Sequence, residues 1–559
     1  MPIKNTIFLC APNSAKAFRS RHMKTLVLFH FQIAEFSNTA LSLRRMDKKV
    51  RTRFAPSPTG GLNLGGVRTA LFDYLFAKQH GGDFVLRIED TDQTRFVEGA
   101  EKYIYETLKW CGIQPDESPE KGGAFAPYRQ SERKEIYKKY AEELIAKGYA
   151  YYAFDTPEEL EKMRVDFKTD ANPAPRYDIT IRGKMRNALA LSADEVKNLL
   201  GKNTPYVIRI KMPERNEVVK FTDMIRGEVQ FNTSESDDKV LLKADGMPTY
   251  HLAVVADDYL MHITHAFRGE EWLPSAPAHI LLWKYLFGLE NMPQWAHVPL
   301  ILKPNGNGKL SKRDSEKLGF PAFAMNWTDP RTNETAQGFR ERGFLPEAFI
   351  NMLAMLGWND GSDKEIFSLQ ELTEKFSMER VHKAGAKFSY EKALWFNHEW
   401  IKNSSAEKLL PDVKAVFAEK NILVKNDAVL LQVIDLIKER CTLLPDFLEQ
   451  AGYFFQTPET IDMAAIQPKW NVQKENFFAE LIRAYELSDD FGNPEAMELS
   501  FKEMAAANQL KSGELMMPLR IMLVGGKFGP KIFDVAAVLG KEETIKRIRQ
   551  GLKLLVLPD

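Results

Sequence analysis

The order of polar and apolar positions near the start of the patterned region predicts a strand, a helix and a second strand. Charged and apolar side chains alternate over Val50–Ala55, as in a half-buried strand, and the turn residues of Pro56–Gly61 interrupt the alternation. Gly65-Gly66 opens a segment with apolar residues at helical spacing, and Phe84–Ile88 is typical of the next strand. A strand, a glycine-rich turn, a helix and a strand form a βαβ unit, so we expect an α/β domain with a parallel sheet.

The middle of the chain has a different pattern. Short helical stretches alternate with β-rich runs such as Tyr206–Lys211 and Val240–Lys243, which predicts an insertion with a sheet of its own. Apolar alternation returns at Tyr250–Val255 and Ile263–Phe267. We expect these two runs to be strands in the second half of the parallel sheet.

Strand signals are absent after about residue 400, where helical periodicity dominates. The predicted helices include Ala406–Lys420, Ala428–Leu444 and Glu543–Leu555. Neither an internal repeat nor a low-complexity tract is visible. The C-terminal third is therefore predicted to be an α-helical module.

Composition excludes several classes of protein. The chain has 559 residues and equal numbers of basic and acidic side chains, 76 of each, so a nucleic-acid surface would have to be a local patch. Cys10, Cys111 and Cys441 lie far apart without a CxxC pair, which argues against a disulfide framework and a zinc knuckle and favours a reducing cytoplasm. No run approaches the roughly 18 apolar residues needed to span a membrane.

Residues 1–45 differ from the rest of the chain. They carry seven basic side chains and one acidic one, Glu35, as in an organellar transit peptide. The alternative is upstream sequence that is not translated, because Met46 stands directly before the first predicted strand. We exclude this extension, disordered or untranslated, from the fold.

Two segments could hold phosphate groups. The first is the turn Arg53–Gly66, where small residues lead into a helix N-terminus that suits an anion, although it has neither P-loop nor dinucleotide-turn spacing. The second is Gly308–Arg313, where Lys309 and Lys312 in a glycine-flanked loop could clamp phosphates as mobile charges. Taken singly, a plain turn and a solvated basic loop are the alternatives.

Together the two segments resemble the paired signatures of class I aminoacyl-tRNA synthetases. Four further segments narrow the likeness to the glutamyl-tRNA synthetases of the bacterial type, from about Val50 to the C-terminus. These segments are Arg87–Asp92, Pro127–Arg133, Asp245–Ala253 and Phe267–Trp272.

The resemblance implies a pocket for L-glutamate. In this family Arg53 and Arg268 would bind the carboxylates, since an arginine fork suits bidentate recognition. Glu89 would take the α-ammonium, and Tyr250 and Ser57 would complete the pocket. The alternative for Arg53 and Glu89 is a structural ion pair at adjacent strand ends.

The resemblance also implies ATP as co-substrate, with Mg²⁺ assisting and no zinc. Asn63, Lys309 and Lys312 are the expected catalytic residues. The expected ATP-binding residues are Pro56, Ser57, Thr59, Gly60, Asn63, Gly65, Gly66, Glu271, Trp272, Lys309, Ser311, Lys312 and Arg313. Arg95 and Arg440 are the expected tRNA contacts, although Arg440 could equally be an ordinary surface arginine.

One position departs from the family pattern. Asn63 stands where the first histidine of the signature is expected, and an amide can donate a hydrogen bond but cannot be cationic. A catalytically impaired tRNA-binding protein is therefore an alternative to an active enzyme. His262 and His265 could suggest a metal site but are expected on a strand without nearby cysteine, and His251 is expected to be structural.

The fold class that follows is α/β: a Rossmann-like parallel-sheet catalytic domain with an inserted α+β domain, then an all-α anticodon-binding module. The implied activity is ATP-dependent activation of L-glutamate and its transfer to the 3′-terminal adenosine of tRNA(Glu), by a cytoplasmic, non-membrane, monomeric ligase. Charging of tRNA(Gln) as well stays open, while helical residues 401–559 argue against a shorter tRNA-modifying relative and a glutaminyl enzyme. The expected segments are 46–129 and 250–308 for the catalytic domain, 130–249 for an acceptor-stem-binding insertion, 309–400 for a stem-contact segment and 401–559 for the anticodon-binding domain.

Overall fold

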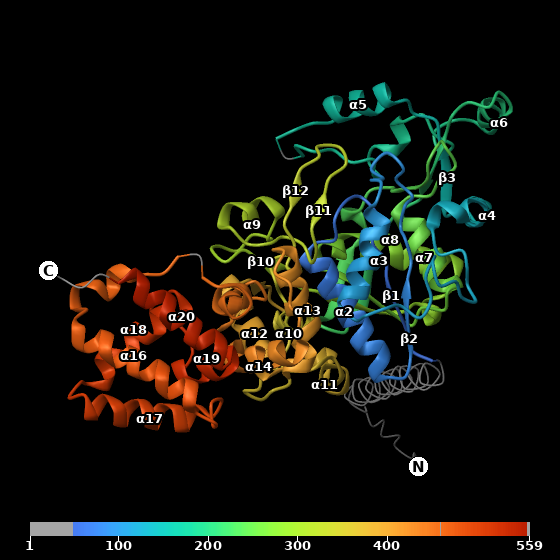
Figure 1. Ribbon diagram of the computed structural model, residues 1–559. Helices are drawn as coiled ribbons and strands as arrows, with labels where there is room; N and C mark the ends of the chain where they lie inside the picture. The colour runs from blue at the N-terminus through green and yellow to red at the C-terminus, as the bar shows by residue number, and fades with distance from the viewer. Residues whose placement is uncertain (1–48, 171, 459, 556–559) are drawn as a thin grey trace, which may run out of the picture. The chain divides into compact units, whose positions relative to one another are not determined.

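The computed structural model describes residues 49–555 except 171 and 459, so the predicted extension 1–45 lies outside the described residues (Figure 1). The described chain divides into two compact units. The first contains residues 49–57, 73–94 and 115–298, and the second contains residues 58–72, 95–114 and 299–555. The predicted domain boundaries stay predictions.

A six-stranded sheet forms the centre of the first unit. All neighbouring strands in it are parallel except the last pair, so the βαβ prediction is confirmed. The helix between the first two strands, α2 (Leu64–Gln79), follows the glycine-rich turn. In spatial order the strands are β2 (Asp83–Leu86), β1 (Arg51–Phe54), β8 (His265–Gly269), β9 (Gln294–Val298), β5 (Val218–Asp223) and β6 (Gly227–Asn232).

The prediction of a strand at Tyr250–Val255 is wrong. This segment begins helix α7 (Tyr250–Leu260), which packs with α4 (Lys134–Ala146) and α8 (Ala276–Leu286) in one hydrophobic core. Every residue of Leu252–Asp258 is buried. A helix buried on all sides has no polar face, so periodicity cannot distinguish it from a buried strand.

The segment between α4 and α7 carries a smaller antiparallel sheet, as predicted. Its strands are β3 (Ala150–Ala153), β4 (Val207–Ile210) and β7 (Val240–Leu242), and its helices are α5 (Pro157–Asp166) and α6 (Ala193–Gly201). Both helices begin with a complete capping box, Thr156 with Glu159 and Ser192 with Glu195. Strands β5 and β6 come from the same stretch of sequence but extend the six-stranded sheet.

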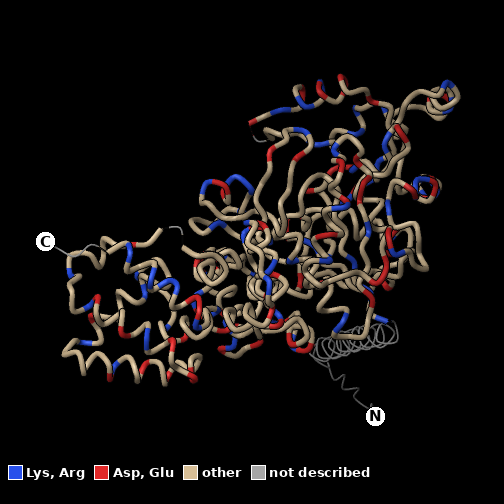
Figure 2. Tube along the Cα trace, viewed as in Figure 1, with Lys and Arg blue, Asp and Glu red and all other residues tan. Residues whose placement is uncertain are grey.

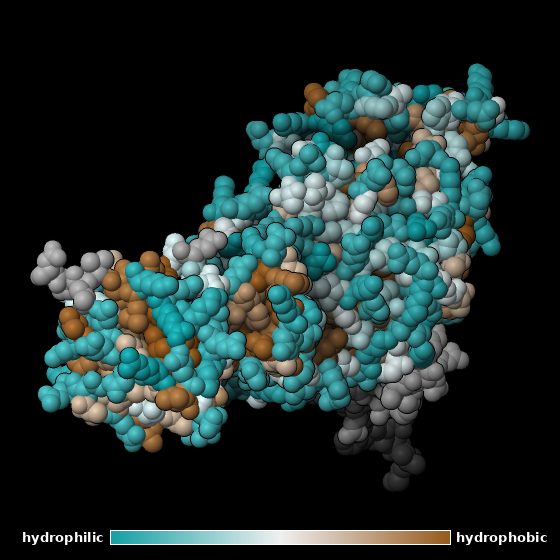
Figure 3. All heavy atoms as spheres, in the orientation of Figure 1, coloured by the Kyte–Doolittle hydropathy of each residue, from teal (hydrophilic) through white to brown (hydrophobic). Residues whose placement is uncertain are grey.

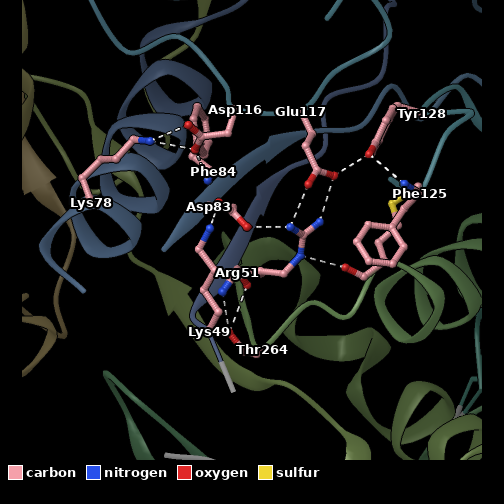
Figure 4. Close-up of polar contacts among 11 residues, drawn as sticks. Lys49, Arg51, Lys78, Asp83, Phe84, Asp116, Glu117, Phe125, Tyr128 and Thr264 are labelled. Carbon is pink, nitrogen blue, oxygen red and sulfur yellow. Dashed lines mark hydrogen bonds and ion pairs between the residues drawn. The ribbon is translucent and has the colours of Figure 1, made fainter. Parts of the chain in front are cut away.

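Charged side chains fix the starts of β1 and β2 (Figure 4). The Arg51 guanidinium donates to both oxygens of Glu117 at 2.9 Å and to Asp83 at 2.7 Å. The Tyr128 hydroxyl also donates to Glu117. The hydrogen bond from Arg51 is the largest influence on Glu117 and lowers its pKa. These contacts satisfy a buried arginine and tie the loop after β2 to the sheet.

The second unit is mainly helical. Its described strands form two short pairs, β10 (Ile301–Leu302) with β13 (Ala386–Lys387) and β11 (Trp327–Thr328) with β12 (Thr335–Ala336), and helices are its main regular elements. Those before residue 404 are α3 (Ala100–Trp110), α9 (Lys312–Leu318), α10 (Pro346–Met355), α11 (Leu369–Lys375) and α12 (Tyr390–Asn403). Those after it are α13 (Ala406–Glu419), α14 (Asp427–Ile437), α15 (Asp446–Ala451), α16 (Val472–Leu487), α17 (Pro494–Ala507), α18 (Ser512–Val524), α19 (Ile532–Leu539) and α20 (Lys541–Leu554).

No strand follows β13 in the described part of the chain, which confirms the predicted helical module. One predicted helix is too long, because α14 ends at Ile437 rather than at Leu444. The Asp446 carboxylate accepts hydrogen bonds from the backbone of Thr442 and Leu443 at 2.7 and 2.9 Å and so helps to begin the next helix. None of the described helices is long and apolar enough to cross a membrane.

Candidate functional site

Arg53 and Glu89 lie at the carboxyl ends of the first two parallel strands. Arg53 is on β1 in register with Val85 of β2, and Glu89 follows β2. The backbone N–H of Glu89 donates to the carbonyl of Pro56 at 3.0 Å, so the two strand ends stay together. Ligands of open α/β sheets bind at this edge.

Arg53 and Glu89 each have an ionic partner of their own rather than one another. Arg53 Nε donates to Asp258 Oδ1 at 3.0 Å, and Arg53 Nη1 donates to the carbonyl of Phe267 at 2.9 Å. Glu89 Oε1 accepts from Arg87 Nη2 at 3.0 Å. Arg87 Nη1 donates to the same oxygen of Asp258 at 2.8 Å. Alternating charges thus run from Arg53 through Asp258 and Arg87 to Glu89.

The protonation of this chain of charges follows from burial and from neighbouring charges. Burial would raise the pKa of Asp258, but Arg53 and Arg87 outweigh burial and lower it. Burial would lower the pKa of Arg53, and Asp258 reverses the shift. For Glu89 burial dominates, so its pKa is raised although Arg87 and Arg53 oppose the rise. The array can present a guanidinium at one end and a carboxylate at the other.

Arg268 is held differently, by neutral acceptors. On neighbouring strands, Arg268 of β8 is in register with His297 of β9, and its Nε donates to His297 Nε2 at 3.0 Å. Its Nη1 lies 3.1 Å from His279 Nδ1 and 3.4 Å from the Tyr250 hydroxyl. Its Nη2 is buried and has no hydrogen-bond partner among the residues that the structure describes. The guanidinium also stacks on Trp295, 4.4 Å from the ring centre.

The structure brings four of the five predicted glutamate-binding residues together. The Tyr250 hydroxyl is subject to the charges of Arg268, Glu89 and Arg53, and burial, the largest influence, raises its pKa. The Tyr250 ring also packs against Trp272, with ring centres 4.5 Å apart. Ser57, the fifth residue, is exposed.

Glu271 and Trp272, predicted to bind ATP, lie in the short 3₁₀ helix Glu270–Ser275 that follows β8. Both side chains are exposed and can therefore meet a ligand. Pro56, by contrast, is buried. It can contribute its backbone, whose carbonyl already accepts a hydrogen bond from the Glu89 N–H.

In the second unit, Asn63 caps helix α2. Its side-chain Oδ1 accepts from the Gly66 N–H at 2.9 Å, and its carbonyl accepts from the Val67 N–H at 3.1 Å. Capping occupies the amide oxygen. The N–H₂ group of Asn63 is therefore the part of the side chain that can donate to a ligand. Thr59 and Gly60 precede this turn and are partly exposed, and a Cβ on Gly66 would lie 2.5 Å from Leu62.

The segment Gly308–Arg313 also leads into a capped helix, α9. Ser311 Oγ accepts from the Asp314 N–H, and Asp314 accepts in return from the Ser311 N–H at 3.1 Å, so Ser311 begins α9. Lys303 Nζ lies 2.9 Å from Asp314, whose pKa is lowered to about 2, first by Ser311 and then by Lys303. Lys312 is the first residue of α9 and lies 3.5 Å from Glu316. Both basic and acidic residues lie on this short helix (Figure 2).

The remaining predicted site residues are exposed. Lys309 pairs with Leu302 in an isolated β-bridge, and Arg313 is the second residue of α9. Arg95 lies before α3, and Arg440 ends the 3₁₀ turn Lys438–Arg440 after α14.

The structure adds polar residues that the sequence did not single out. Asp258 and Arg87 join the ends of the charged chain. His279 and His297 contact Arg268, and Asp223 contacts His297. The available signal was a charged or imidazole side chain inside an apolar run, as in Ala253–Tyr259 and Gln294–Val298. Such a residue must find a partner when buried.

The predicted placement of His262 on a strand is wrong. His262 adopts a positive φ of 54° in the turn before β8, and only His265 is on the strand. Residues 261–264 connect the end of α7 to β8. Within the described residues, no group of three or more His, Cys, Asp or Glu side chains is arranged to hold a metal ion.

Comparison with known proteins places the chain in a family. Residues 49–395 match the model of the catalytic domain of tRNA synthetases class I (E and Q), and residues 404–552 match an anticodon binding domain. The glutamate–tRNA ligase of Amoebophilus asiaticus is 48% identical over 91% of this chain and 99% of its own length. The glutamate–tRNA ligase of Flavobacterium johnsoniae is 49% identical over 91% of this chain and its own full length, 100%.

Solved structures agree with the sequence comparison. The crystal structure of a glutamate tRNA ligase from Elizabethkingia meningosepticum in complex with its amino acid has a TM-score of 0.86 and 50% identity, covering 91% of this chain and 100% of that one. Glutamate-tRNA synthetase from Elizabethkingia anophelis has a TM-score of 0.82 and 50% identity, covering 90% and 100% of the two chains. The chain therefore belongs to the class I tRNA synthetases (E and Q).

Proposed function

We propose that this protein is a glutamate–tRNA ligase, which uses ATP to activate L-glutamate and transfers the glutamyl group to the 3′-terminal adenosine of tRNA(Glu). The observation that carries the proposal is the charge pattern around Tyr250. Two buried guanidiniums, Arg53 and Arg268, and one carboxylate, Glu89, match the two carboxylates and single ammonium of glutamate. The names of the relatives, at 48 and 49% identity, support the same substrate.

We assign the contacts to glutamate as follows. Arg53 and Arg268 each bind one carboxylate, and Glu89 accepts hydrogen bonds from the α-ammonium. Asp258 orients Arg53, and Arg87 orients Glu89, through the hydrogen bonds described above. Because the pocket groups are already hydrogen-bonded in place, little reorganisation is needed when the substrate binds.

The activation step is an in-line displacement. An oxygen of the α-carboxylate forms a bond to the α-phosphorus of ATP, the bond to the bridging oxygen breaks, and pyrophosphate leaves. Asn63 Nδ2, the N-terminus of α2, Lys309 and Lys312 stabilise the negative charge on the phosphates. The 2′-hydroxyl of the terminal adenosine then attacks the carbonyl carbon of the adenylate, and AMP leaves.

Mg²⁺ belongs to this proposal as a companion of ATP. It binds proteins through one or two carboxylates together with substrate phosphates, and when bound it would neutralise phosphate charge. The described residues show no ready-made cage of His, Cys, Asp or Glu side chains, so none is assigned as a ligand. No zinc site is assigned either.

The anticodon-binding match over residues 404–552 supports tRNA as the partner. We assign Arg440 to this surface and Arg95 to a second tRNA contact; both side chains are exposed. We also propose that the enzyme is a cytoplasmic monomer. Cys111 and Cys441 are buried and form no disulfide among the described residues, which suits a reducing compartment. Size-exclusion chromatography with light scattering tests the monomer.

The test of the function is ATP–pyrophosphate exchange with L-glutamate, with and without tRNA(Glu). We expect exchange with glutamate, dependent on tRNA, and a loss on the order of 10²-fold in Lys312→Ala. Lys317→Ala, on the same helix and exposed, is the matched control and should exchange at the wild-type rate. If no amino acid gave exchange while tRNA binding stayed intact, the protein would be a tRNA-binding protein and not a ligase.

A further inference from the structure

A buried chain of polar side chains crosses the first unit and has Arg268 at its centre. Asp223 Oδ2 lies 2.6 Å from His297 Nδ1, and His297 Nε2 accepts from Arg268 Nε at 3.0 Å. On the other side, Arg268 Nη1 lies 3.1 Å from His279 Nδ1, and His279 Nε2 lies 3.1 Å from His251 Nδ1. The members come from β5, β9, β8, α8 and α7.

The direction of every hydrogen bond in this chain is determined by Arg268. A guanidinium has only donors, so His297 Nε2 and His279 Nδ1 must both be acceptors, and both imidazoles are neutral. His297 then carries its proton on Nδ1, toward Asp223, and His279 carries its proton on Nε2, toward His251. Burial, Arg268 and the neighbouring imidazole all lower the pKa of His279 well below its ordinary value.

The result is an unusual environment for a buried cation. No carboxylate contacts Arg268 among the described residues, whereas Arg53 and Arg87 both contact Asp258. Arg268 Nη2 is buried and has no hydrogen-bond partner in the described part of the chain, and the whole residue is 7% exposed. A buried charge without a counter-ion is costly, and the cost is removed when an anion binds.

We propose that His279 and His297 form a neutral clamp that positions Arg268 without compensating its charge, so that the pocket selects an amino acid with a carboxylate at this point. This inference rests on the proposed function and deepens it. Within it, the histidines are positioning residues. Their contribution is that they hold a guanidinium firmly and leave its charge, and the free Nη2, to the substrate.

Two other interpretations of the histidines do not fit the geometry. A metal site would bring the three imidazoles together, but the guanidinium lies between His279 and His297, and no metal-holding group occurs among the described residues. A proton relay would require Arg268 to give up a proton, and arginine stays protonated in proteins.

The test compares a neutral and a charged side chain of the same size at one position. In His279→Asn, Oδ1 can replace Nδ1 as a neutral acceptor, while in His279→Asp a carboxylate takes its place and compensates Arg268. We expect the KM for L-glutamate in tRNA-dependent exchange to rise a few-fold at most in H279N and on the order of 10²-fold in H279D, since a charge-assisted hydrogen bond is lost. The kcat should change less than the KM.

A second readout measures the selection itself. The ratio of kcat/KM for L-glutamate to that for L-glutamine should fall in H279D and be retained largely in H279N, because only the charged variant removes the need for an anion. L-glutamate should also raise the melting temperature less in H279D than in H279N. This thermal melt does not depend on catalysis. His297→Gln and His297→Glu repeat the comparison at Nε2 and decide the matter if H279D does not fold.

The outcomes are distinct from those of the function test. Equal effects of H279N and H279D on KM and on the glutamate-to-glutamine ratio would show that His279 is merely structural and would overturn the clamp. A wild-type protein without exchange would overturn the proposed function instead, and the clamp would then be judged from the thermal melts.

Discussion

At the scale of single residues, Asn63 combines two tasks that its two amide atoms divide between them. The oxygen caps α2 through the Gly66 N–H at 2.9 Å, and the nitrogen is the group we assign to ATP. A histidine at this position could donate a hydrogen bond but is a poor cap. The asparagine is therefore compatible with an ordered helix start as well as with a donor to phosphate.

These two tasks can be separated by substitution at position 63. Asn63→Asp keeps the capping oxygen but replaces the donor with a negative charge, so we expect an unchanged melting temperature and a loss of exchange on the order of 10²-fold. Asn63→Ala removes both groups and should also lower the free energy of unfolding by about 1 kcal/mol. Chemical denaturation and exchange assays measure the two effects. Wild-type exchange in N63D would refute the assignment of Nδ2 to ATP.

Arg53 and Arg268 show how residues of one type differ through their partners. Arg53 contacts the carboxylate of Asp258 at 3.0 Å, whereas the hydrogen bonds of Arg268 within the described part of the chain go to imidazoles and a hydroxyl. Both are buried. The charge of Arg53 is compensated by a carboxylate and that of Arg268 is not. In the proposed function this difference suits the two carboxylates of glutamate, of which one is activated and the other is only recognised.

At the scale of elements, the loop between α18 and α19 carries an exposed aromatic side chain. Phe528 in this loop is 86% exposed, so its ring is open to solvent. Arg520, on α18, lies close enough to Tyr453 and Arg440 for their charges to affect its pKa; burial, first, and Arg440 lower it. Apolar patches are visible over the C-terminal helices on one face of the molecule (Figure 3).

Exposed aromatic rings beside cations suit single-stranded nucleotides, because a base can stack on the ring while phosphates meet the charges. We expect Phe528→Ala to raise the KM for tRNA(Glu) about tenfold or more, as loss of one stacked base would. The KM values for glutamate and ATP should not change, and neither should the melting temperature. Leu499→Ala, exposed on α17, is the matched control. An unaltered KM for tRNA in F528A would exclude this loop from the tRNA surface.

At the scale of the whole molecule, the buried histidines link stability to pH. Burial chiefly lowers the pKa of His251, to about 4, and burial also lowers the pKa values of His279 and His297. In the unfolded chain these groups have their ordinary pKa of about 6.5. Their contribution to stability is therefore complete above about pH 6.5 and is lost as the pH falls toward the folded values, because the unfolded state binds more protons.

This linkage can be measured with one substitution. His251→Asn keeps an acceptor toward His279 but cannot titrate, so its free energy of unfolding should fall less steeply than that of the wild type below pH 6.5. From pH 6.5 to pH 5 the free energy of unfolding of the wild type should fall by about 1–2 kcal/mol more than that of the variant. This corresponds to the uptake of up to one additional proton per molecule on unfolding. Urea denaturation at several pH values gives both curves, which should run parallel above pH 7. Parallel curves throughout would contradict a lowered pKa of His251 in the folded protein.

Local chemistry determined much of this protein from its sequence alone. The βαβ unit around the glycine-rich turn, the separate small sheet and the C-terminal helices follow from periodicity and turn residues, which act between neighbours in the chain. The signature segments identified the family because they are contiguous, and Arg53, Glu89, Tyr250 and Arg268 were nameable for the same reason.

Tertiary structure decided what depends on partners distant in sequence. Tyr250–Val255 lies in a helix whose residues Leu252–Asp258 are all buried, and burial of that kind removes the polar face by which a helix is recognised. Arg53 meets Asp258, and Arg268 meets His279 and His297, only because parallel strands and the helices packed on them bring separate segments to one edge. Which arginine is compensated by a carboxylate and which is not is a property of that packing, since no local pattern specifies a partner many residues away.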